Sequence, residues 1–247
     1  MIETNRFGQP VGARLAERRV PIEPQRTVLE GAGCRLEPLD AEKHADPLWN
    51  AYSEAGDPRD WTYLTWGPFA DRAALRAWAR ERENDSGAVF HAVVVDGFAC
   101  GVGAYLSVAP EHATVELGHL HFAPRLRRTS AATEALHLWI DHAFALGYRR
   151  IEWKCDVLNA PSRSAARRLG FSFEGIFRNH RSVRGRSRDT AWYAIVEQDW
   201  PALRAIHREW LAAHGNEPGA GPAFRLSERT APLRRPDPKD FPPHTPI

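Results

Sequence analysis

The sequence predicts one α/β domain with a mixed central sheet, and three observations support this fold class. The chain has 247 residues, 43% of them hydrophobic and 26% charged, which suffices for one full core. Segments with strand-like alternation of apolar residues alternate along the chain with segments of helical spacing, and the two kinds are not confined to separate halves. The resulting order, β-α-α-β-β-β-α-β-α-β-β, contains no internal repeat.

Charge and cysteine content argue against several classes of protein. The formal net charge of +2 gives no strong field for nucleic acid or a membrane surface. Cys34, Cys100 and Cys155 are far apart and form no C-x-x-C pair, which disfavours a disulfide framework or a structural zinc site and favours a reducing, cytoplasmic location. The N-terminus is polar and no run of about 18 apolar residues occurs, so neither a signal peptide nor a membrane span is predicted.

Composition divides the chain into four parts. Residues 1–30 are predicted to form an extended arm, because Pro, Gly, Arg and Glu occur there without sustained periodicity. Residues 31–200 form the predicted α/β domain, and residues 201–215 a C-terminal helix. Residues 216–247 hold eight prolines, a density that predicts a disordered tail.

The first half of the domain is predicted to contain a strand, two helices and a hairpin. An aspartate indicates each helix start, since its side chain can accept from the first free N–H groups: Asp40 or Asp46 for one helix, Asp71 for the other. The predicted segments are a strand over Cys34–Leu39, a helix through Trp49 and Tyr52, a helix carrying Leu75 and Trp78, and a hairpin of Val89–Val95 and Gly101–Val108 turning at Asp96-Gly97.

A change of phase in the next strand predicts a β-bulge. Residues 113, 115 and 117 are apolar, but after Gly118 the apolar residues are Leu120 and Phe122. One extra residue near Gly118–His119 restores a single buried face. Such a bulge bends the strand and leaves backbone amides free to bind something else.

The second half contains the longest helical pattern. From Thr129 to Leu146 apolar residues recur at i, i+3, i+4, i+7 and i+8, and Gly147 suits the position just after a helix end. The other predicted segments are a strand over Ile151–Val157, a short helix from Pro161 to Arg168, strands over Phe171–Phe177 and Ala191–Val196 around a turn at Gly185, and a helix over Trp200–Ala213.

The junction between the bulged strand and the long helix predicts an anion site. Residues 122–132 form a basic loop with small residues that leads into a helix N-terminus. The free amides of about Arg127 to Ala132 and the positive end of the helix dipole favour a pyrophosphate there. An ordinary strand-to-helix turn with solvated arginines fits this segment equally well.

Two motifs in matching order resemble the GNAT superfamily, specifically its RimJ/RimL-like branch. The phosphate loop of that family, Gln/Arg-x-x-Gly-x-Gly/Ala, is similar to residues 127–132, which Thr-Glu-Ala follows. Asn159 and Ser162, before a helix ending Leu-Gly-Phe at 169–171, match the second motif, and residues 174–178 are also similar to this branch. The resemblance covers about residues 30–200. It implies a GNAT-like, mostly antiparallel mixed sheet with a bulged strand and flanking helices.

The resemblance further implies an acetyl-CoA-dependent N-acetyltransferase whose acceptor is a primary amine, on a protein N-terminus or a small molecule. An amine of pKa about 10 is protonated at neutral pH, so a base must act. Glu116 is the expected base and Ser162 the expected acid, although a surface carboxylate and a helix-capping serine fit these residues too. Bulge amides near His119–Leu120 suit an oxyanion. Acetyl-CoA contacts are expected at His121, Phe122, Arg127, Arg128, Thr129, Ser130, Ala131, Ala132 and Asn159.

Two departures from the family pattern bear on this expectation. Ser130 replaces the first glycine of the phosphate loop, so a backbone angle open only to glycine would be lost. Ala166 stands where many GNAT enzymes have the tyrosine that protonates the leaving thiolate, so a different acid is required.

Acceptor-side residues are expected in two aromatic segments. Trp61, Tyr63, His180 and Trp192 are the candidates, although most aromatics in such segments cover the core instead. No metal site is predicted, because no third ligand accompanies His119 and His121 at a spacing typical of metal sites.

Two other functions and the oligomeric state stay open at this point. A non-catalytic acetyl-CoA sensor is compatible with Ser130 and Ala166, and the arginines at 178–188 are compatible with an RNA- or ribosome-associated module. Nucleic acid is nevertheless disfavoured as a partner, since acidic residues flank those arginines and no aromatic RNA-binding pattern occurs. Monomer and homodimer are both allowed.

Overall fold

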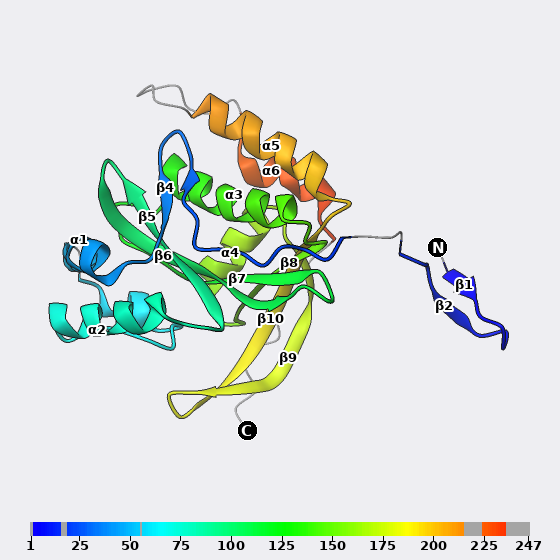
Figure 1. Cartoon of the computed structure of the whole chain (residues 1–247), viewed down its shortest axis with the longest axis horizontal. Coiled ribbons are helices and arrows are strands. Elements are labelled where there is room, and N and C mark those ends of the chain that lie inside the picture. Colours follow the sequence, from blue (N-terminus) through cyan, green and yellow to red (C-terminus); the bar gives the residue numbers. More distant parts are fainter. Residues whose placement is uncertain (1, 16–18, 55, 215–223, 236–247) are drawn as a thin grey trace.

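A computed structural model describes residues 2–15, 19–54, 56–214 and 224–235. Its centre is an eight-stranded sheet in the order β3-β4-β5-β6-β7-β8-β10-β9, in which β7 and β8 are parallel and the other neighbours antiparallel (Figure 1). The predicted mixed, mostly antiparallel sheet is confirmed. Its strands are β3 (Leu29–Glu30), β4 (Arg35–Pro38), β5 (Ala88–Val95), β6 (Phe98–Ala109), β7 (Thr114–Phe122), β8 (Arg150–Asp156), β9 (Ser172–Val183) and β10 (Arg186–Val196).

Helices cover both faces of the sheet and enclose two apolar clusters (Figure 1). On one face α1 (Ala41–Ser53) and α2 (Arg72–Glu83) bury Leu48 and Leu75 against β5 and β6. On the other face Trp139 and Ile140 of the central helix lie in the larger cluster. The helices of this second layer are α3 (Ser130–Ala145), α4 (Ala160–Arg168), α5 (Trp200–Ala213) and α6 (Leu226–Thr230).

Side-chain caps fix where α1, α2 and α3 begin. Asp40 Oδ1 accepts from the amides of Glu42 and Lys43, so α1 starts at Asp40 rather than at Asp46. Asp71 caps α2 as predicted, and Thr129 caps α3. Because each cap satisfies otherwise free N–H groups, it contributes about 1 kcal/mol to the stability of its helix.

The two ends of the chain contain more regular structure than composition indicates. In the N-terminal arm β1 (Ile2–Thr4) and β2 (Pro10–Gly12) form a hairpin, because Asn5 Oδ1 accepts from the amides of Phe7 and Gln9 and closes the turn. Figure 1 shows this hairpin away from the main body of the domain.

The Pro-rich C-terminal segment is not disordered throughout, which corrects the prediction for residues 216–247. Within it α6 and the 3₁₀ turn Ala231–Leu233 pack on the domain, since Leu226 and Thr230 are buried and Thr230 Oγ1 donates to the Arg168 carbonyl. Prolines are allowed in the first turn of a helix, as at Pro232, so their number does not exclude one. Residues 215–223 and 236–247 lie outside the described part of the chain.

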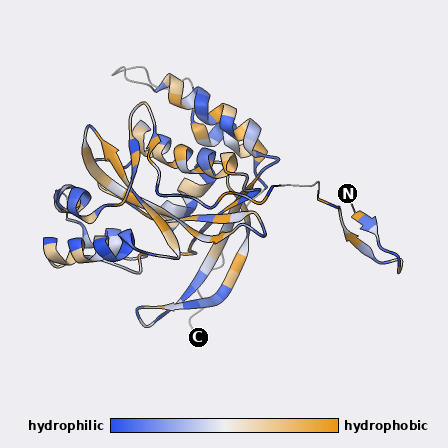
Figure 2. Cartoon of the chain, in the orientation of Figure 1, coloured by the Kyte–Doolittle hydropathy of each residue, from blue (hydrophilic) through white to orange (hydrophobic). Residues whose placement is uncertain are grey.

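The last two strands form a long hairpin that projects from the sheet (Figure 1). β9 continues to Val183, six residues beyond the predicted end at Phe177, and pairs with β10 from Arg186 onward. Figure 2 shows that the projecting part is mostly hydrophilic, whereas the central strands are apolar. Because neither face of this extension is buried, its sequence lacks the alternation of apolar and polar residues by which a strand is predicted.

Candidate active site

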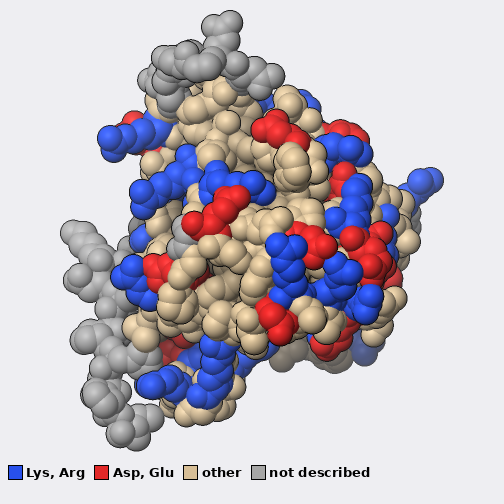
Figure 3. All heavy atoms as spheres, turned by 90° about the vertical axis from the view of Figure 1, so that its left-hand side faces the viewer, with Lys and Arg blue, Asp and Glu red and all other residues tan. Residues whose placement is uncertain are grey.

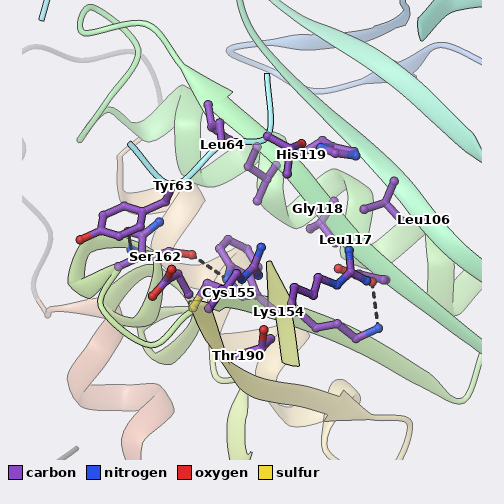
Figure 4. Close-up of a pocket in the computed structure, with 18 of the residues that line it drawn as sticks. Tyr63, Leu64, Leu106, Leu117, Gly118, His119, Lys154, Cys155, Ser162 and Thr190 are labelled. Atoms are coloured by element: carbon purple, nitrogen blue, oxygen red, sulfur yellow. Dashed lines mark hydrogen bonds and ion pairs between the residues drawn. The ribbon is translucent and has the colours of Figure 1, made fainter. Parts of the chain in front are cut away.

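The parallel strands β7 and β8 diverge in the middle of the sheet. They pair at Thr114–Arg150, Val115–Ile151 and Glu116–Glu152 and no further. Beyond this point a cavity of about 350 Å³ opens between them. Figure 4 shows that Tyr63 and Leu64 border it from the loop before α2, and Lys154, Cys155 and Thr190 from β8 and β10.

The predicted β-bulge lies on the wall of this cavity. Val102 pairs with His121 and Ala104 with Gly118, so His119 and Leu120 together face only Gly103. His119 adopts a left-handed φ of 52°, and this conformation changes the direction of the strand at the bulge. The bulge is therefore confirmed at the expected position, and both bulged residues line the cavity.

Glu116 faces the cavity as one member of an ion-pair cluster. Its Oε2 lies 2.8 Å from Lys154 Nζ and 3.1 Å from Ser107 Oγ. Lys154 also contacts Glu152 Oε2 at 2.8 Å and lies 4.2 Å above the ring of Trp192. Glu116 Oε1 hydrogen-bonds to no described residue, so one oxygen is held while the other is available to a bound molecule.

The His119 side chain has a fixed role beside this carboxylate. Its Nδ1 accepts from Trp66 Nε1 at 3.2 Å, and its ring stacks on Phe90. Because Nδ1 is an acceptor, the proton of the neutral imidazole belongs on Nε2. Burial lowers the pKa of His119, which favours that neutral form. His119 is thus held at the cavity wall as a neutral ring whose Nδ1 is already occupied by Trp66.

The loop before α3 offers backbone amides, but fewer than predicted. The amides of Arg127 and Thr129 donate to Ala123 and Leu126 carbonyls, and that of Ala132 donates to Thr129 Oγ1. Among the described residues, no partner accepts from the amides of Arg128, Ser130 and Ala131. Of the six backbone amides predicted to bind an anion, three are therefore free to do so.

The left-handed residue of this loop is Arg128, with φ of 63°. Ser130 is the first residue of α3 and has helical backbone geometry, so it needs no glycine angle. The replacement of the family glycine by Ser130 thus does not disturb the loop. A β-carbon at Arg128 costs about 1–2 kcal/mol in that conformation.

The Arg127 side chain anchors neighbouring segments rather than pointing outward. Its Nε donates to the Phe122 carbonyl and its Nη1 to Asp60 Oδ1, both at 2.7 Å. Through Asp60 the phosphate loop holds the loop before α2.

Asn159 and Ser162 meet at the start of α4, on the rim of the cavity. Asn159 Oδ1 accepts from the Ser162 amide and is the N-cap, so the capping role considered for Ser162 belongs to Asn159. Ser162 Oγ accepts from Trp153 Nε1 at 3.0 Å, and its hydroxyl also hydrogen-bonds to the Cys155 side chain. Burial raises the pKa of the adjacent Cys155 thiol to about 11, so Cys155 is no nucleophile at neutral pH.

The structure separates the aromatic candidates into core and cavity residues. Trp61 is only 8% exposed and stacks on His121, 6% exposed, at 3.9 Å between ring centroids. Neither the Trp61 nor the His121 side chain lines the cavity, so the structure places both of these predicted site residues in the core beside it. Phe122 likewise is not among the lining residues. Tyr63 and His180 do line it. Trp192 lies beneath Lys154 instead.

Comparison with known proteins identifies the family. A model described as an acetyltransferase (GNAT) domain matches residues 34–172, more than half of the chain. The chain belongs to the GNAT acetyltransferase family. A GCN5-related N-acetyltransferase from Brucella melitensis is 38% identical, with a TM-score of 0.82 over 86% of this chain and 98% of that one. YnaD, an uncharacterized N-acetyltransferase of Bacillus subtilis strain 168, is 26% identical over 156 residues, 62% of this chain and 89% of YnaD.

The GNAT fold also accounts for the acetyl donor. MccE, whose crystal structure is a complex with acetyl-CoA and AMP, has the same fold at 19% identity and a TM-score of 0.60, over 67% of this chain and 93% of that chain. GNAT acetyltransferases use acetyl-CoA, and the three free amides at Arg128, Ser130 and Ala131 beside a diverging strand pair fit a pyrophosphate and its extended arm.

Three residues that line this cavity were not among the site residues predicted from the sequence. Lys154 lies on β8 and meets Glu116 of β7, and Arg181 and Arg188 line the far wall. Each depends on a pairing between strands, which local spacing does not reveal. No described helix is long and apolar enough to cross a membrane.

Proposed function

We propose that this GNAT domain acetylates a primary amine and that Glu116 is its general base. The observation that carries the proposal is the free Glu116 Oε1 at the cavity wall, next to the bulge where the strands diverge. An amine beside it would lose its proton to this oxygen and could then attack the acetyl carbonyl. Lys154 and Ser107 fix the orientation of the carboxylate.

The other groups have distinct proposed roles. The unpaired backbone at His119–Leu120 would donate to the oxyanion, since bulged residues lack a full ladder partner. Ser162 carries a hydroxyl proton and borders the cavity, so it is the proposed acid for the leaving thiolate. Asn159, Arg128, Ser130 and Ala131 would hold acetyl-CoA.

The motifs at 127–135 and 174–178 support membership of the RimJ/RimL-like branch, which includes acetylases of protein N-termini and of small amines. The three described cysteines are free and buried, which supports a reducing cytoplasm as the location.

Glu116→Gln tests the base directly, with Glu152→Gln as a matched control. Both carboxylates contact Lys154, but only Glu116 lines the cavity. We expect Glu116→Gln to lower kcat by about 10²- to 10⁴-fold in a thiol-release assay on a panel of amines. Its Kd for acetyl-CoA should stay within about threefold of the unmodified protein.

Two outcomes would contradict this function. An equal loss of kcat in both variants would show that the ion-pair cluster, not the base, matters. Tight acetyl-CoA binding without thiol release from any amine would favour the non-catalytic sensor instead.

A further inference from the structure

The acceptor wall of the cavity carries two cations that no described residue neutralises. Arg181 of β9 and Arg188 of β10 are directly opposite one another in the strand register. Both line the cavity. No described carboxylate forms an ion pair with either of them, and the Arg188 Nε is buried without a hydrogen-bond partner.

This arrangement is unfavourable in the protein by itself. Like charges directly opposite on neighbouring strands destabilise the pairing. A buried donor without an acceptor adds a desolvation cost. On the α1–α2 face, by contrast, basic side chains are paired: Arg76 with Asp46, and Arg80 with Glu42, form ion pairs between the two helices. Figure 3 shows acidic and basic side chains intermixed on that face.

Of the acidic residues that line the described part of the cavity, Glu116 and Asp156, neither forms an ion pair with Arg181 or Arg188. Glu116 contacts Lys154, which is also held by Glu152. Asp156 Oδ1 accepts from the Leu158 amide. His180 lies close to both arginines, and its pKa is lowered by burial and then by their charges, so it adds a neutral ring to the same wall.

We propose that the acceptor amine carries an anionic group, a carboxylate or a phosphoryl group, which Arg181 and Arg188 bind while the amine reaches Glu116. The inference rests on the proposed N-acetyltransferase function and narrows its substrate class. Guanidinium groups suit both anions, because their planar forks donate two parallel hydrogen bonds to either one. The pair thereby positions the amine and selects against neutral analogues.

The neighbouring contacts hold the arginine pair over the cavity. Arg184, at the tip of the same hairpin, donates to the carbonyls of Trp66 and Gly67 in the loop before α2. Thr190 Oγ1 lies 3.0 Å from His180 Nδ1 and ties the two strands together below the arginines. The hairpin is therefore braced at its tip and again between His180 and Thr190.

The test uses pairs of amines that differ only in the anionic group. Glycine and glycinamide, β-alanine and β-alaninamide, and phosphoethanolamine and ethanolamine vary both the anion and the spacer. Thiol release is measured at saturating acetyl-CoA, with kcat/KM corrected to the concentration of unprotonated amine. We expect at least one anionic member to be favoured by about 10- to 100-fold. The carboxylate and phosphoryl pairs show which anion is used.

Variants assign the preference to the arginine pair. Arg181→Gln with Arg188→Gln should reduce the anionic preference to less than about threefold. Arg186→Gln is the matched control, because Arg186 is exposed on the same hairpin but does not line the cavity, and it should leave the preference intact. A preference below threefold in the unmodified protein, or an equal loss in the control, would overturn the inference.

Binding measurements separate this inference from the proposed function. The favoured anionic amine and its neutral analogue are titrated calorimetrically into the protein saturated with CoA. In the unmodified protein the Kd of the anionic amine should be at least about tenfold lower than that of the neutral analogue, and in the double variant this difference should be lost. That result without thiol release would refute catalysis and retain the anion site. Acetylation of neutral and anionic amines alike would retain catalysis and refute the anion site. Loss of acetyl-CoA affinity in the double variant would also refute it, since the arginines would then hold the phosphates of the donor.

Discussion

Replacing His121 with Phe should make the protein more resistant to acid. The His121 ring is buried among Trp61 and Tyr52, and neither ring nitrogen has a hydrogen-bond partner among the described residues. Burial, followed by the charge of Arg127, lowers its pKa from 6.5 to about 3. Above pH 6.5 the imidazole is neutral in the folded and unfolded states, so its titration does not affect stability there.

Below pH 6.5 His121 binds a proton in the unfolded chain, whereas in the folded protein it stays neutral until the pH approaches its lowered pKa. Stability is therefore lost as the pH falls from about 6.5 toward the folded pKa, at about 1.4 kcal/mol per pH unit for each such histidine. At pH 5 His121 alone would cost about 2 kcal/mol. His91, with a pKa lowered mainly by burial to about 4, and His207, lowered in the same way to about 3, act in the same direction. The three together would cost about 6 kcal/mol between pH 6.5 and 5.

The measurement is the free energy of unfolding by urea at half-unit steps from pH 7 to pH 5. His121→Phe should reduce the pH-dependent loss by about 2 kcal/mol at pH 5. It should also be neutral or stabilising at pH 7, because it removes two unsatisfied nitrogens while keeping an aromatic ring on Trp61. His112→Gln is the control, since that side chain is 76% exposed and its replacement should leave the slope unchanged. An unchanged slope for His121→Phe would show that water reaches the ring and would refute the reasoning.

Two further predictions concern the cavity wall and the phosphate loop. In Gly118→Ala the added β-carbon would lie 2.7 Å from Leu106 Cδ1 and 3.4 Å from Glu116 Oε1. Because it would crowd the Glu116 carboxylate, kcat should fall about tenfold. Tm should change little, because the half-buried Leu106 side chain can move away. An unchanged kcat would contradict the placement of Glu116. Thr129→Ala removes the cap of α3 and the hydrogen bond to the Leu126 carbonyl, so it should cost about 1 kcal/mol of stability and weaken acetyl-CoA binding severalfold by calorimetry. Thr129→Ser keeps both bonds and should behave like the unmodified protein.

Much of the fold could be predicted because its signals are local. The phase shift after Gly118 required a bulge, and Asp71 could cap a helix only where one begins. The start of α1 was ambiguous between Asp40 and Asp46 because both residues suit a cap. The structure favours Asp40, whose carboxylate reaches two amides.

The site was harder to predict because its contacts join distant segments. An aromatic residue in a loop gives the same local signal whether it packs inward, as Trp61 does, or borders a cavity, as Tyr63 does. The pairing of Glu116 with Lys154 requires two strands separated by the whole of α3. The opposition of Arg181 and Arg188 depends on a hairpin register that the polar sequence of the strands does not specify.

The loop before α2 connects these separate parts of the site. Asp60 binds Arg127 of the phosphate loop, the carbonyls of Trp66 and Gly67 accept from Arg184 of the hairpin, and Tyr63 Oη donates to the Leu158 carbonyl at 3.2 Å. The loop thus touches the donor side, the acceptor side and the segment just before α4.

This connection bears on the missing family tyrosine. Ala166 is fully buried in α4 and does not line the cavity, so it supplies no proton there. Ser162 and Tyr63 both line the cavity and carry hydroxyl groups, one from α4 and the other from the loop, where Tyr63 Oη donates to the Leu158 carbonyl. If the proton for the thiolate came from Tyr63, breaking the Asp60–Arg127 contact would impair turnover through a residue that touches neither substrate. If it came from Ser162, turnover would survive that change, because Asn159 and Trp153 hold Ser162 independently of the loop.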